Sequence, residues 1–307
     1  MSGNDASLLD LLKSWPLAVL PHQLLSRLVR SATRWRASWW KNPLIRLFIR
    51  HFNVDMSEAE AANAEDYADF NSFFTRALKP DVRAFPDDQQ AITSPVDGRV
   101  SQAGDIRAGR LIQAKGRDYS LTALLGDNQQ HAADFENGKF ATLYLSPRDY
   151  HRIHMPCQGQ LLETTYVPGR LFSVAPHTTR AIPDLFTRNE RLVTRFDTPA
   201  GPMALIMVGA IFVSCMETVW GGLVNPSMGM RLQRNRFGPG DSPAVNLQRG
   251  EEMGVFNMGS TVILLFAQDR IDWVNDLRPG SPVRLGQILG NIINPLVSQT
   301  ASHRKTS

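Results

Sequence analysis

The sequence contains little cysteine and no long apolar segment. Two cysteines, Cys157 and Cys215, among 307 residues cannot form a disulfide framework, and neither stands in a Cys-x-x-Cys or Cys-x-x-His zinc spacing. No apolar run reaches the length of about 18 residues that crosses a bilayer, and the first residues lack the order of a cleaved secretion signal. These absences predict a chain in a reducing compartment that neither spans a membrane nor is exported, without a bound metal.

The composition is that of an ordinary globular protein with a basic balance. With 43% hydrophobic residues, a chain of this length can bury a sizeable core in one large domain or two small ones. The net charge of +4 indicates an anionic partner, either nucleic acid or an acidic membrane surface. The distribution of charge along the chain has to distinguish these two partners.

Basic and aromatic residues are concentrated in residues 1–51. Eight lysines and arginines alternate there with four of the six tryptophans, Trp15, Trp35, Trp39 and Trp40. Apolar residues between 24 and 29 recur at helical spacing, which is typical of a basic amphipathic helix in a membrane interface. A helical hairpin packed on the body with a solvated basic face is the alternative. Nucleic-acid binding is less favoured, because no groove-reading or stacking motif accompanies the charge.

In the rest of the chain, the pattern of apolar and turn-forming residues changes at about residue 91. Residues 52–90 predict a helical preface, with a capped helix start at Ser57 and a second helix over 69–78. Residues 91–294 contain short apolar runs separated by glycine, proline and Asn/Asp, which predicts an antiparallel, β-rich body with one short helix near 120–126. Residues 295–307 form a polar tail with too little apolar content to fold. The predicted fold class is therefore α+β.

Two polar clusters in this body stand beside turn signals. In "SPVDGRV", Asp97 precedes Gly98, and Asp-Gly is a common hairpin turn, so Asp97 has a purely structural alternative. In "YLSPRDYHRIHMP", His151 and His154 are three residues apart. They would share one face of a helix but lie on opposite faces of a strand. A zinc site would need further ligands that the sequence does not provide at suitable spacing, and two structural histidines remain possible.

The third cluster, Gly259-Ser260-Thr261, interrupts the apolar run "FNMGSTVILLF". An unpaired buried hydroxyl costs about 1–3 kcal/mol, so Ser260 needs either a partner, such as the backbone of a neighbouring strand, or a function. Together the clusters supply an aspartate, a histidine and a serine, which can make a hydroxyl nucleophilic. Ser260 is not in a Gly-x-Ser-x-Gly elbow and has apolar neighbours on both sides. This setting favours attack on the protein's own chain over attack on an external substrate.

Seven segments together, over about residues 45–270, resemble the phosphatidylserine decarboxylase proenzymes of bacteria. In chain order they are "SPVDGRVSQ", "IQAKGRDYSLTALLG", "YLSPRDYHRIHMP", "YVPGRLFSV", "LFTRNERLV", "METVWGG" and "FNMGSTVILLF". The family's usual context is Leu-Gly-Ser-Thr, and Met258 replaces the leucine here with a side chain of similar volume.

The resemblance implies that the chain cuts itself between Gly259 and Ser260. His154, oriented by Asp97, would take the proton from the Ser260 hydroxyl, which attacks the Gly259 carbonyl and converts the amide to an ester. Elimination and hydrolysis with loss of ammonia then turn Ser260 into a covalent pyruvoyl cofactor. The products would be chains 1–259 and 260–307, held together because "TVILLF" stays a strand of the same sheet. His151 is the candidate proton donor in decarboxylation, and Asp149 is an alternative to Asp97.

The resemblance also implies a substrate and a location. The substrate would be phosphatidylserine and the product phosphatidylethanolamine, with release of carbon dioxide in phospholipid biosynthesis. An anionic lipid surface attracts a basic segment by about 1 kcal/mol per cation, so residues 1–51 would dock the enzyme peripherally on the cytoplasmic side of the inner membrane. No nucleic acid or metal is expected as a partner.

Three other readings remain open from the sequence. A pyruvoyl-dependent decarboxylase of a soluble amino acid would share the self-cleavage but not need residues 1–51. A serine hydrolase would keep Ser260 intact. A non-enzymatic module is suggested by "SPVDGRV" and "SPVRLGQILG", which look like the strand turns of lipoyl and biotinyl carriers, although the lysine expected at a hairpin tip is missing. The body is therefore expected to resemble their barrel-sandwich arrangement.

Overall fold

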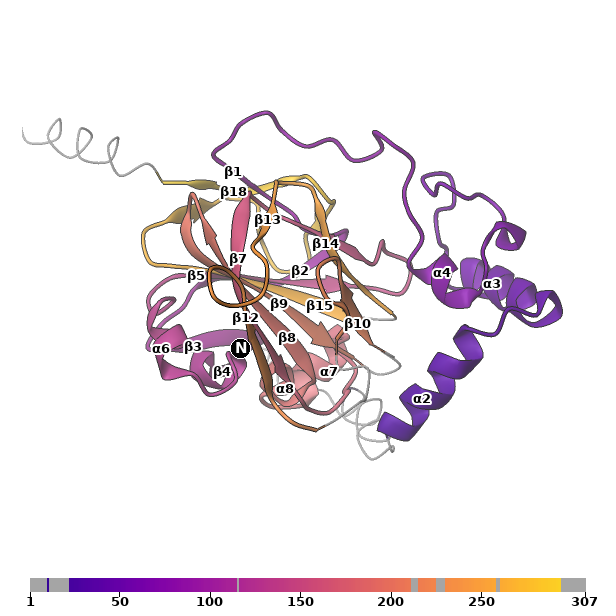
Figure 1. Cartoon of the computed structure of the whole chain (residues 1–307), viewed down its shortest axis with the longest axis horizontal. Helices are drawn as coiled ribbons and strands as arrows, with labels where there is room; N and C mark the ends of the chain where they lie inside the picture. Colours follow the sequence, from indigo (N-terminus) through magenta and orange to yellow (C-terminus); the bar gives the residue numbers. More distant parts are fainter. Residues whose placement is uncertain are drawn as a thin grey trace, which may run out of the picture.

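The computed structural model describes most of the chain, namely residue 10 and segments 22–114, 116–210, 215–224, 230–257 and 260–293. Trp15, Gly259 and the predicted tail at 295–307 lie outside the described residues. Figure 1 shows a β-rich body with three helices, α2, α3 and α4, gathered beside it. The described part is a mixed α+β structure, and all its named strand pairs are antiparallel, as the sequence predicted.

The helices are few and mostly short. The two longest precede the body, and the others are single turns within or beside it: α2 (His22–Thr33), α3 (Ser38–Phe52), α4 (Phe70–Phe74), α5 (Leu121–Leu124), α6 (Gln129–Ala133), α7 (Pro176–Ala181), α8 (Leu185–Arg188) and the 3-10 helix η1 (Ala64–Asp66). The short helix predicted near 120–126 is confirmed as α5. None of the described helices is long and apolar enough to cross a membrane.

The predicted helical preface is confirmed only in part, because α4 lies within the helix predicted over 69–78. No helix begins at Ser57, because its backbone N–H and hydroxyl both bind the Asp55 carboxylate, at 2.9 and 2.6 Å, and hold a turn. The helix predicted over 69–78 ends after Phe74. Residues 77–79 instead pair with residues 58–60 through two backbone hydrogen bonds, Glu60 N–H to Ala77 O and Lys79 N–H to Glu58 O, which form an antiparallel bridge between Ala59 and Leu78. Pairing between distant segments overrides the local helical pattern here.

One large sheet organises the body. Its nine strands are β2 (Gly98–Asp105), β5 (Lys139–Leu145), β7 (Gly159–Val167), β8 (Arg191–Thr198), β9 (Gly201–Gly209), β12 (Gln233–Arg236), β13 (Val245–Leu247), β15 (Ser260–Phe266) and β17 (Pro282–Val283). The spatial order is β12-β7-β8-β9-β15-β5-β2-β17, with β13 also paired to β7. Strand β15 lies between β9 and β5, so the expectation that "TVILLF" is a strand within the main sheet is confirmed.

Three smaller sheets complete the body. One contains β1 (Ala91–Thr93), β18 (Ile288–Ile292) and β16 (Ile271–Trp273), and a two-stranded one contains β3 (Arg110–Ala114) and β4 (Arg117–Ser120). The third has the order β11 (Gly222–Leu223), β10 (Met216–Thr218), β14 (Glu252–Phe256), β6 (Arg152–His154). In this last sheet, β14 ends at Phe256, shortly before Ser260, and β6 ends at His154.

The central strand β15 is buried along its whole length, and its alternate residues enter two different cores. Val262, Leu264 and Phe266 belong to one core, whereas Ile263 and Leu265 belong to another. Side chains of a strand alternate between its two faces, so each core lies on one face of the sheet. A strand covered on both faces reads as a continuous apolar run, which explains the sequence of "TVILLF".

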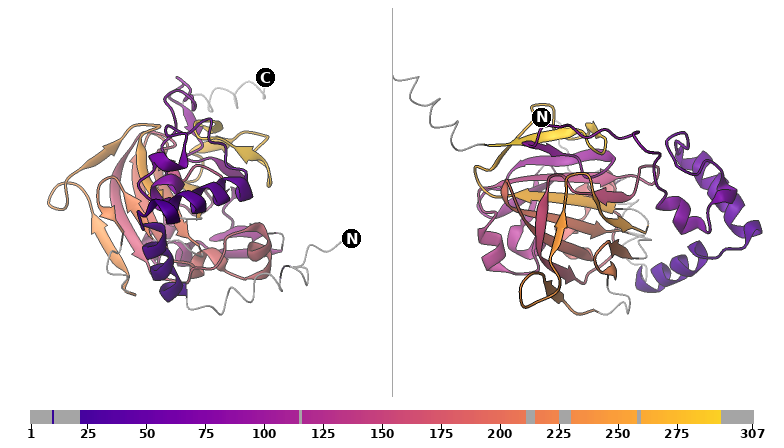
Figure 2. Two further views of the ribbon diagram at one scale, coloured as in Figure 1. Left: turned by 90° about the vertical axis from the view of Figure 1, so that its right-hand side faces the viewer. Right: turned by 45° about the horizontal axis from the view of Figure 1, so that its top comes forward.

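Strand ends bring four sequence segments to one edge of the sheet. Ser260, the first residue of β15, pairs with Leu145 at the end of β5 and with Gly209 at the end of β9. Tyr144 of β5 pairs with Arg99 near the start of β2, directly after the Asp97-Gly98 turn. The helices α2, α3 and α4 lie toward the same side of the body as the ends of β10 and β15 (Figures 1 and 2).

Candidate active site

Ser260 occupies the centre of this edge, and its side chain is shut off from solvent. Ser260 and Thr261 are each about 1% exposed, and neither hydroxyl has a hydrogen-bond partner among the described residues. The alternative of a serine bonded to a neighbouring backbone is therefore not supported. Two adjacent unpaired hydroxyls in an otherwise apolar strand are costly to bury, which is typical of a functional position.

Asp149 holds the turn that follows β5. Both the backbone N–H and the hydroxyl of Ser146 donate to its Oδ2 at 2.7 Å. This turn starts next to Ser260, because Leu145 is the strand partner of Ser260. The carboxylate of Asp149 is thus engaged by the backbone of its own turn, and its carbonyl oxygen is what contacts a histidine.

His151 presents a free basic nitrogen inside the protein. Its Nδ1 lies 2.8 Å from the carbonyl oxygen of Asp149, and its ring packs on Phe74 with centroids 4.1 Å apart. A carbonyl only accepts hydrogen bonds, so Nδ1 carries the hydrogen and Nε2 keeps a lone pair. Nε2 has no partner among the described atoms. Burial of the fully enclosed ring lowers the pKa of His151 to about 3, so the imidazole is neutral.

His154 has the same tautomer but different surroundings. Its Nδ1 lies 2.8 Å from the carbonyl oxygen of Gly250, and its Nε2 lies 3.0 Å from the Tyr150 hydroxyl. By the same argument Nδ1 donates to Gly250, so Nε2 accepts from the Tyr150 hydroxyl. Burial is the main cause that lowers the pKa of His154, while the charge of Asp97 opposes this shift weakly. Both histidines are thus uncharged and can accept a proton.

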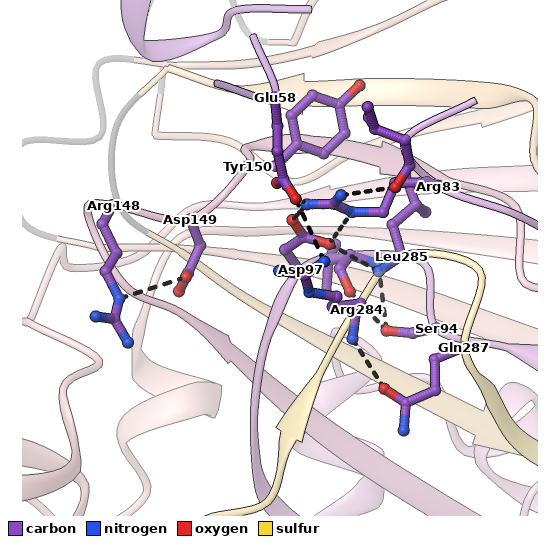
Figure 3. Close-up of polar contacts among 12 residues, drawn as sticks. Glu58, Arg83, Ser94, Asp97, Arg148, Asp149, Tyr150, Arg284, Leu285 and Gln287 are labelled. Atoms are coloured by element: carbon purple, nitrogen blue, oxygen red, sulfur yellow. Dashed lines mark hydrogen bonds and ion pairs between the residues drawn. The ribbon is translucent and has the colours of Figure 1, made fainter. Parts of the chain in front are cut away.

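Asp97 is held by an arginine that the sequence did not single out. Its carboxylate accepts from Arg83 Nε at 3.0 Å and Nη2 at 2.5 Å, and from the backbone N–H of Leu285 at 2.8 Å (Figure 3). Arg83 also pairs with Glu58 at 2.6 Å, and the bonds to Asp97 are the main cause that raises the pKa of Arg83. Asp97 and His154 share no hydrogen bond among the described residues. They are linked by backbone, since His154 N–H donates to Pro95 O at 2.9 Å.

Strand pairing places the two histidines at different positions along β14. The carbonyl of His151 accepts from the N–H of Phe256 at the end of β14, where the chain leads on to Ser260. His154 is paired with Glu252 at the other end of that strand. His151 and His154 are three residues apart on the partner chain segment, and a strand rises about 3.3 Å per residue, so their backbones are separated by about 10 Å at most. The described part of the site therefore brings His151, rather than His154, next to the segment that leads to Ser260.

Sequence reasoning missed three residues that shape the site. Arg83 lies in a segment without a motif, so its pairing with Asp97 depends on folding alone. Tyr150 stands inside the histidine motif, yet its contact with His154 follows from the way β6 begins. Phe74 belongs to an aromatic run that predicted a helix, but the sequence did not indicate its ring contact with His151.

The described residues contain no group of three or more His, Cys, Asp or Glu side chains that could hold a metal ion.

We predict that His151 makes the stability of the fold depend on pH. Its unfolded pKa is near 6.5 and its folded pKa near 3, so unfolding takes up a proton between these values, and the free energy of unfolding falls as pH drops from 6.5 toward 3. His151→Phe should flatten this dependence by up to about 1.4 kcal/mol per pH unit, measured by urea unfolding. The exposed His51→Phe is the matched control. Equal slopes for wild type and His151→Phe would contradict the prediction.

Comparison with known proteins identifies the family of the chain. The family model described as "Phosphatidylserine decarboxylase" matches residues 70–291, and a second, described as "PSD", matches residues 12–53. The chain is 50% identical over 292 residues to the phosphatidylserine decarboxylase proenzyme of Nitrosococcus oceani, an alignment that covers 94% of this chain and 95% of the relative. It is 51% identical over 276 residues to the proenzyme of the same name from Bordetella avium, covering 90% and 93%. It is 49% identical over 274 residues to the proenzyme of the same name from Idiomarina loihiensis, an alignment that covers 89% of this chain and 94% of the relative. With a family model over most of its length and relatives this similar, the chain belongs to the phosphatidylserine decarboxylase family.

Proposed function

We propose that this protein decarboxylates phosphatidylserine to phosphatidylethanolamine, with a pyruvoyl group made from its own Ser260. The relatives are named as proenzymes of this activity, which supports both the reaction and the self-processing. The observation that carries the proposal is the buried, unpaired hydroxyl of Ser260 at the first position of the central strand. The pyruvoyl group supplies a ketone that condenses with the substrate's amine and draws electrons from the bond to the departing carboxylate.

In self-cleavage, the Ser260 hydroxyl attacks the carbonyl carbon of Gly259 and the amide becomes an ester. Following the family resemblance, we assign the base to His154, whose neutral imidazole can take the proton, although His151 lies closer to the end of β14. We assign to Asp97 the stabilisation of the resulting positive charge through space. A glycine at 259 permits the close approach that an intramolecular acyl shift needs. The chains 1–259 and 260–307 would stay associated, because β15 is hydrogen-bonded to a strand on each side.

In decarboxylation, we assign the return of a proton to the substrate's α-carbon to His151. The ring is enclosed and uncharged in the precursor, so it must first gain a proton before it can donate one. A substrate carboxylate bound beside the ring would raise the pKa of His151 by favouring its charged form. Loss of that carboxylate as carbon dioxide would then leave an acid next to the new carbanionic centre.

The helices before the body are proposed to dock the enzyme on an anionic membrane at its cytoplasmic face. Trp35 and Trp39 are 49% and 70% exposed, and their rings pack edge to face 5.0 Å apart. Leu28 and Leu47 are also largely exposed on α2 and α3, 60% and 63% respectively. Exposed tryptophan and leucine beside arginines are typical of a segment that lies in the interface of a bilayer.

The body is further proposed to be related to the lipoyl and biotinyl carriers in architecture. The two carrier-like segments lie side by side, since Val283 of β17 pairs with Gly98 of β2 and Gly286 N–H donates to Ser94 O at 3.1 Å. Two matching turns that cap each other across a pair of strands would fit a barrel-sandwich arrangement.

We expect Ser260→Ala to abolish both cleavage and activity. Intact mass measurement of the purified wild-type protein should reveal a fragment that begins at position 260 and is lighter than its serine form by one ammonia, whereas the variant stays a single chain. Release of carbon dioxide from phosphatidylserine, and not from free serine, should accompany the fragment. A single wild-type chain with Ser260 intact, after incubation at neutral pH with lipid, would contradict the proposed function.

We expect His151→Ala to separate the two reactions. The variant should still convert to two chains, because His154 is the assigned base, but its decarboxylation should fall by about 100-fold or more. His154→Ala should instead remain uncleaved. The opposite pattern, with His151→Ala uncleaved and His154→Ala processed, would exchange the two assignments.

We expect the paired substitution Trp39→Ala with Leu47→Ala to weaken binding to vesicles of phosphatidylglycerol and phosphatidylcholine. Burial of each side chain in the interface is worth about 1.5–3 kcal/mol, so the affinity in a sedimentation assay should drop by more than about tenfold. The matched control is Leu162→Ala with Val219→Ala, two exposed apolar residues of the body. Equal losses in the two variants would contradict docking through the helices.

A further inference from the structure

Asn257 is a buried polar residue at the entrance to the Gly259–Ser260 bond. It directly follows β14, stands two positions before Gly259 and is 1% exposed. Its backbone N–H donates to Cys215 O at 3.0 Å, and its side-chain Nδ2 donates to Glu217 Oε1 at 2.9 Å. Backbone and side chain are thus both attached to the β10 region, and the chain leaves Asn257 toward Ser260 from a fixed point.

The carboxylate of Glu217 determines which way the Asn257 amide points. A carboxylate only accepts hydrogen bonds, so the NH₂ group of Asn257 faces Glu217 and its Oδ1 faces the other way. On that side, Asn71 Nδ2 donates to Asn257 Oδ1 at 2.7 Å. Asn71 lies in α4, the same helix that places Phe74 on the ring of His151. The amide of Asn257 therefore connects the body to the helix over the site.

A second contact reaches the end of helix α2. Arg34, directly after α2, donates from Nη2 to the same Oε1 of Glu217 at 3.2 Å. The two side chains are 37% and 33% exposed, and an ion pair in such a setting contributes only about 0–1 kcal/mol to stability. Its main effect is therefore on the orientation of Glu217, and through it on Asn257.

We infer that Asn257, oriented by Glu217, is a positioning residue for self-cleavage, and that Asn71 and Arg34 tie this position to the helices proposed to bind the membrane. The inference rests on the proposed function, since it concerns the geometry of the Ser260 hydroxyl and the Gly259 carbonyl. An intramolecular acyl shift needs the two reacting atoms within about 3–3.5 Å in a defined orientation, and a displacement of about 1 Å can cost 100-fold in rate. Attachment of the chain just before the bond restricts that displacement.

The test follows cleavage of the full-length precursor made by cell-free translation in the presence of phosphatidylglycerol and phosphatidylethanolamine vesicles. Asn257→Ala and Asn257→Asp should slow the first-order conversion to two chains by about 10- to 100-fold, because the first lacks the amide and the second opposes Glu217 with a like charge. Glu217→Gln keeps an acceptor but no longer fixes the direction of the amide, so it should slow cleavage less than either Asn257 variant. Arg34→Ala should slow cleavage by a few-fold. The exposed Asn246→Ala is the matched control and should cleave like the wild type.

Two further measurements separate positioning from stability. The pH profile of cleavage should keep its shape in Asn257→Ala, since no proton-carrying group has changed. The melting temperature of each variant, measured in a Ser260→Ala background that stays one chain, should not follow the loss in rate.

Wild-type rates for Asn257→Ala would overturn the inference while leaving the proposed function intact, and so would a loss that tracks the melting temperature. If Asn257→Ala does not fold, Arg34→Ala decides, and its cleavage at the wild-type rate overturns the link to the helices. A wild-type chain that does not cleave would instead refute the proposed function.

Discussion

The burial of β15 on both faces is the constraint on which the rest of this structure depends. The strand lies between β5 and β9, and its residues enter two separate cores. Its first residue is therefore fixed by hydrogen bonds on both sides before any chemistry occurs. The backbone of this serine is fixed by its neighbours, and its buried hydroxyl has no hydrogen-bond partner among the described residues. The sheet fixes the position of Ser260, and the turns around its edge carry the residues proposed to react with it.

The polar groups around this edge form two sets that differ in the strength of their hydrogen bonds. Asp97 and Arg83 form a bidentate, mostly buried pair that also anchors Leu285, so the turn before β2 is held by strong, charge-assisted bonds. The two histidines are instead held by neutral bonds: each donates from Nδ1 to a carbonyl oxygen, which fixes its tautomer, and His154 also accepts at Nε2 from the Tyr150 hydroxyl. Strong pairs thus shape the site, while weakly held neutral rings remain able to exchange protons.

Much of the fold was predictable from the sequence, because strand periodicity and turn residues are local signals. The antiparallel body, the short helix α5 and the placement of "TVILLF" in the main sheet follow from such patterns. The helix expected over 69–78 ends early because residues 77–79 pair with residues 58–60, a contact that no local pattern reveals. The motifs named Asp97, both histidines and Ser260, but the partners Arg83, Tyr150 and Asn257 emerge only when distant segments meet. Neither the salt bridge between Arg83 and Asp97 nor the hydrogen bonds of the Asn257 side chain to α4 and β10 produce a repeating pattern in the sequence.

The hydrogen-bonded, doubly covered position of Ser260 also sets how such an enzyme would age. A cofactor that is part of a central strand cannot dissociate, so it can be neither diluted away nor replenished from a cellular pool. Chemical damage to that one group would be permanent, and recovery of activity would require synthesis of a new polypeptide. With the proposed pyruvoyl group, the working life of each molecule would be the survival time of a single carbonyl, and the cores on either side of β15 would also protect that carbonyl from water and other amines.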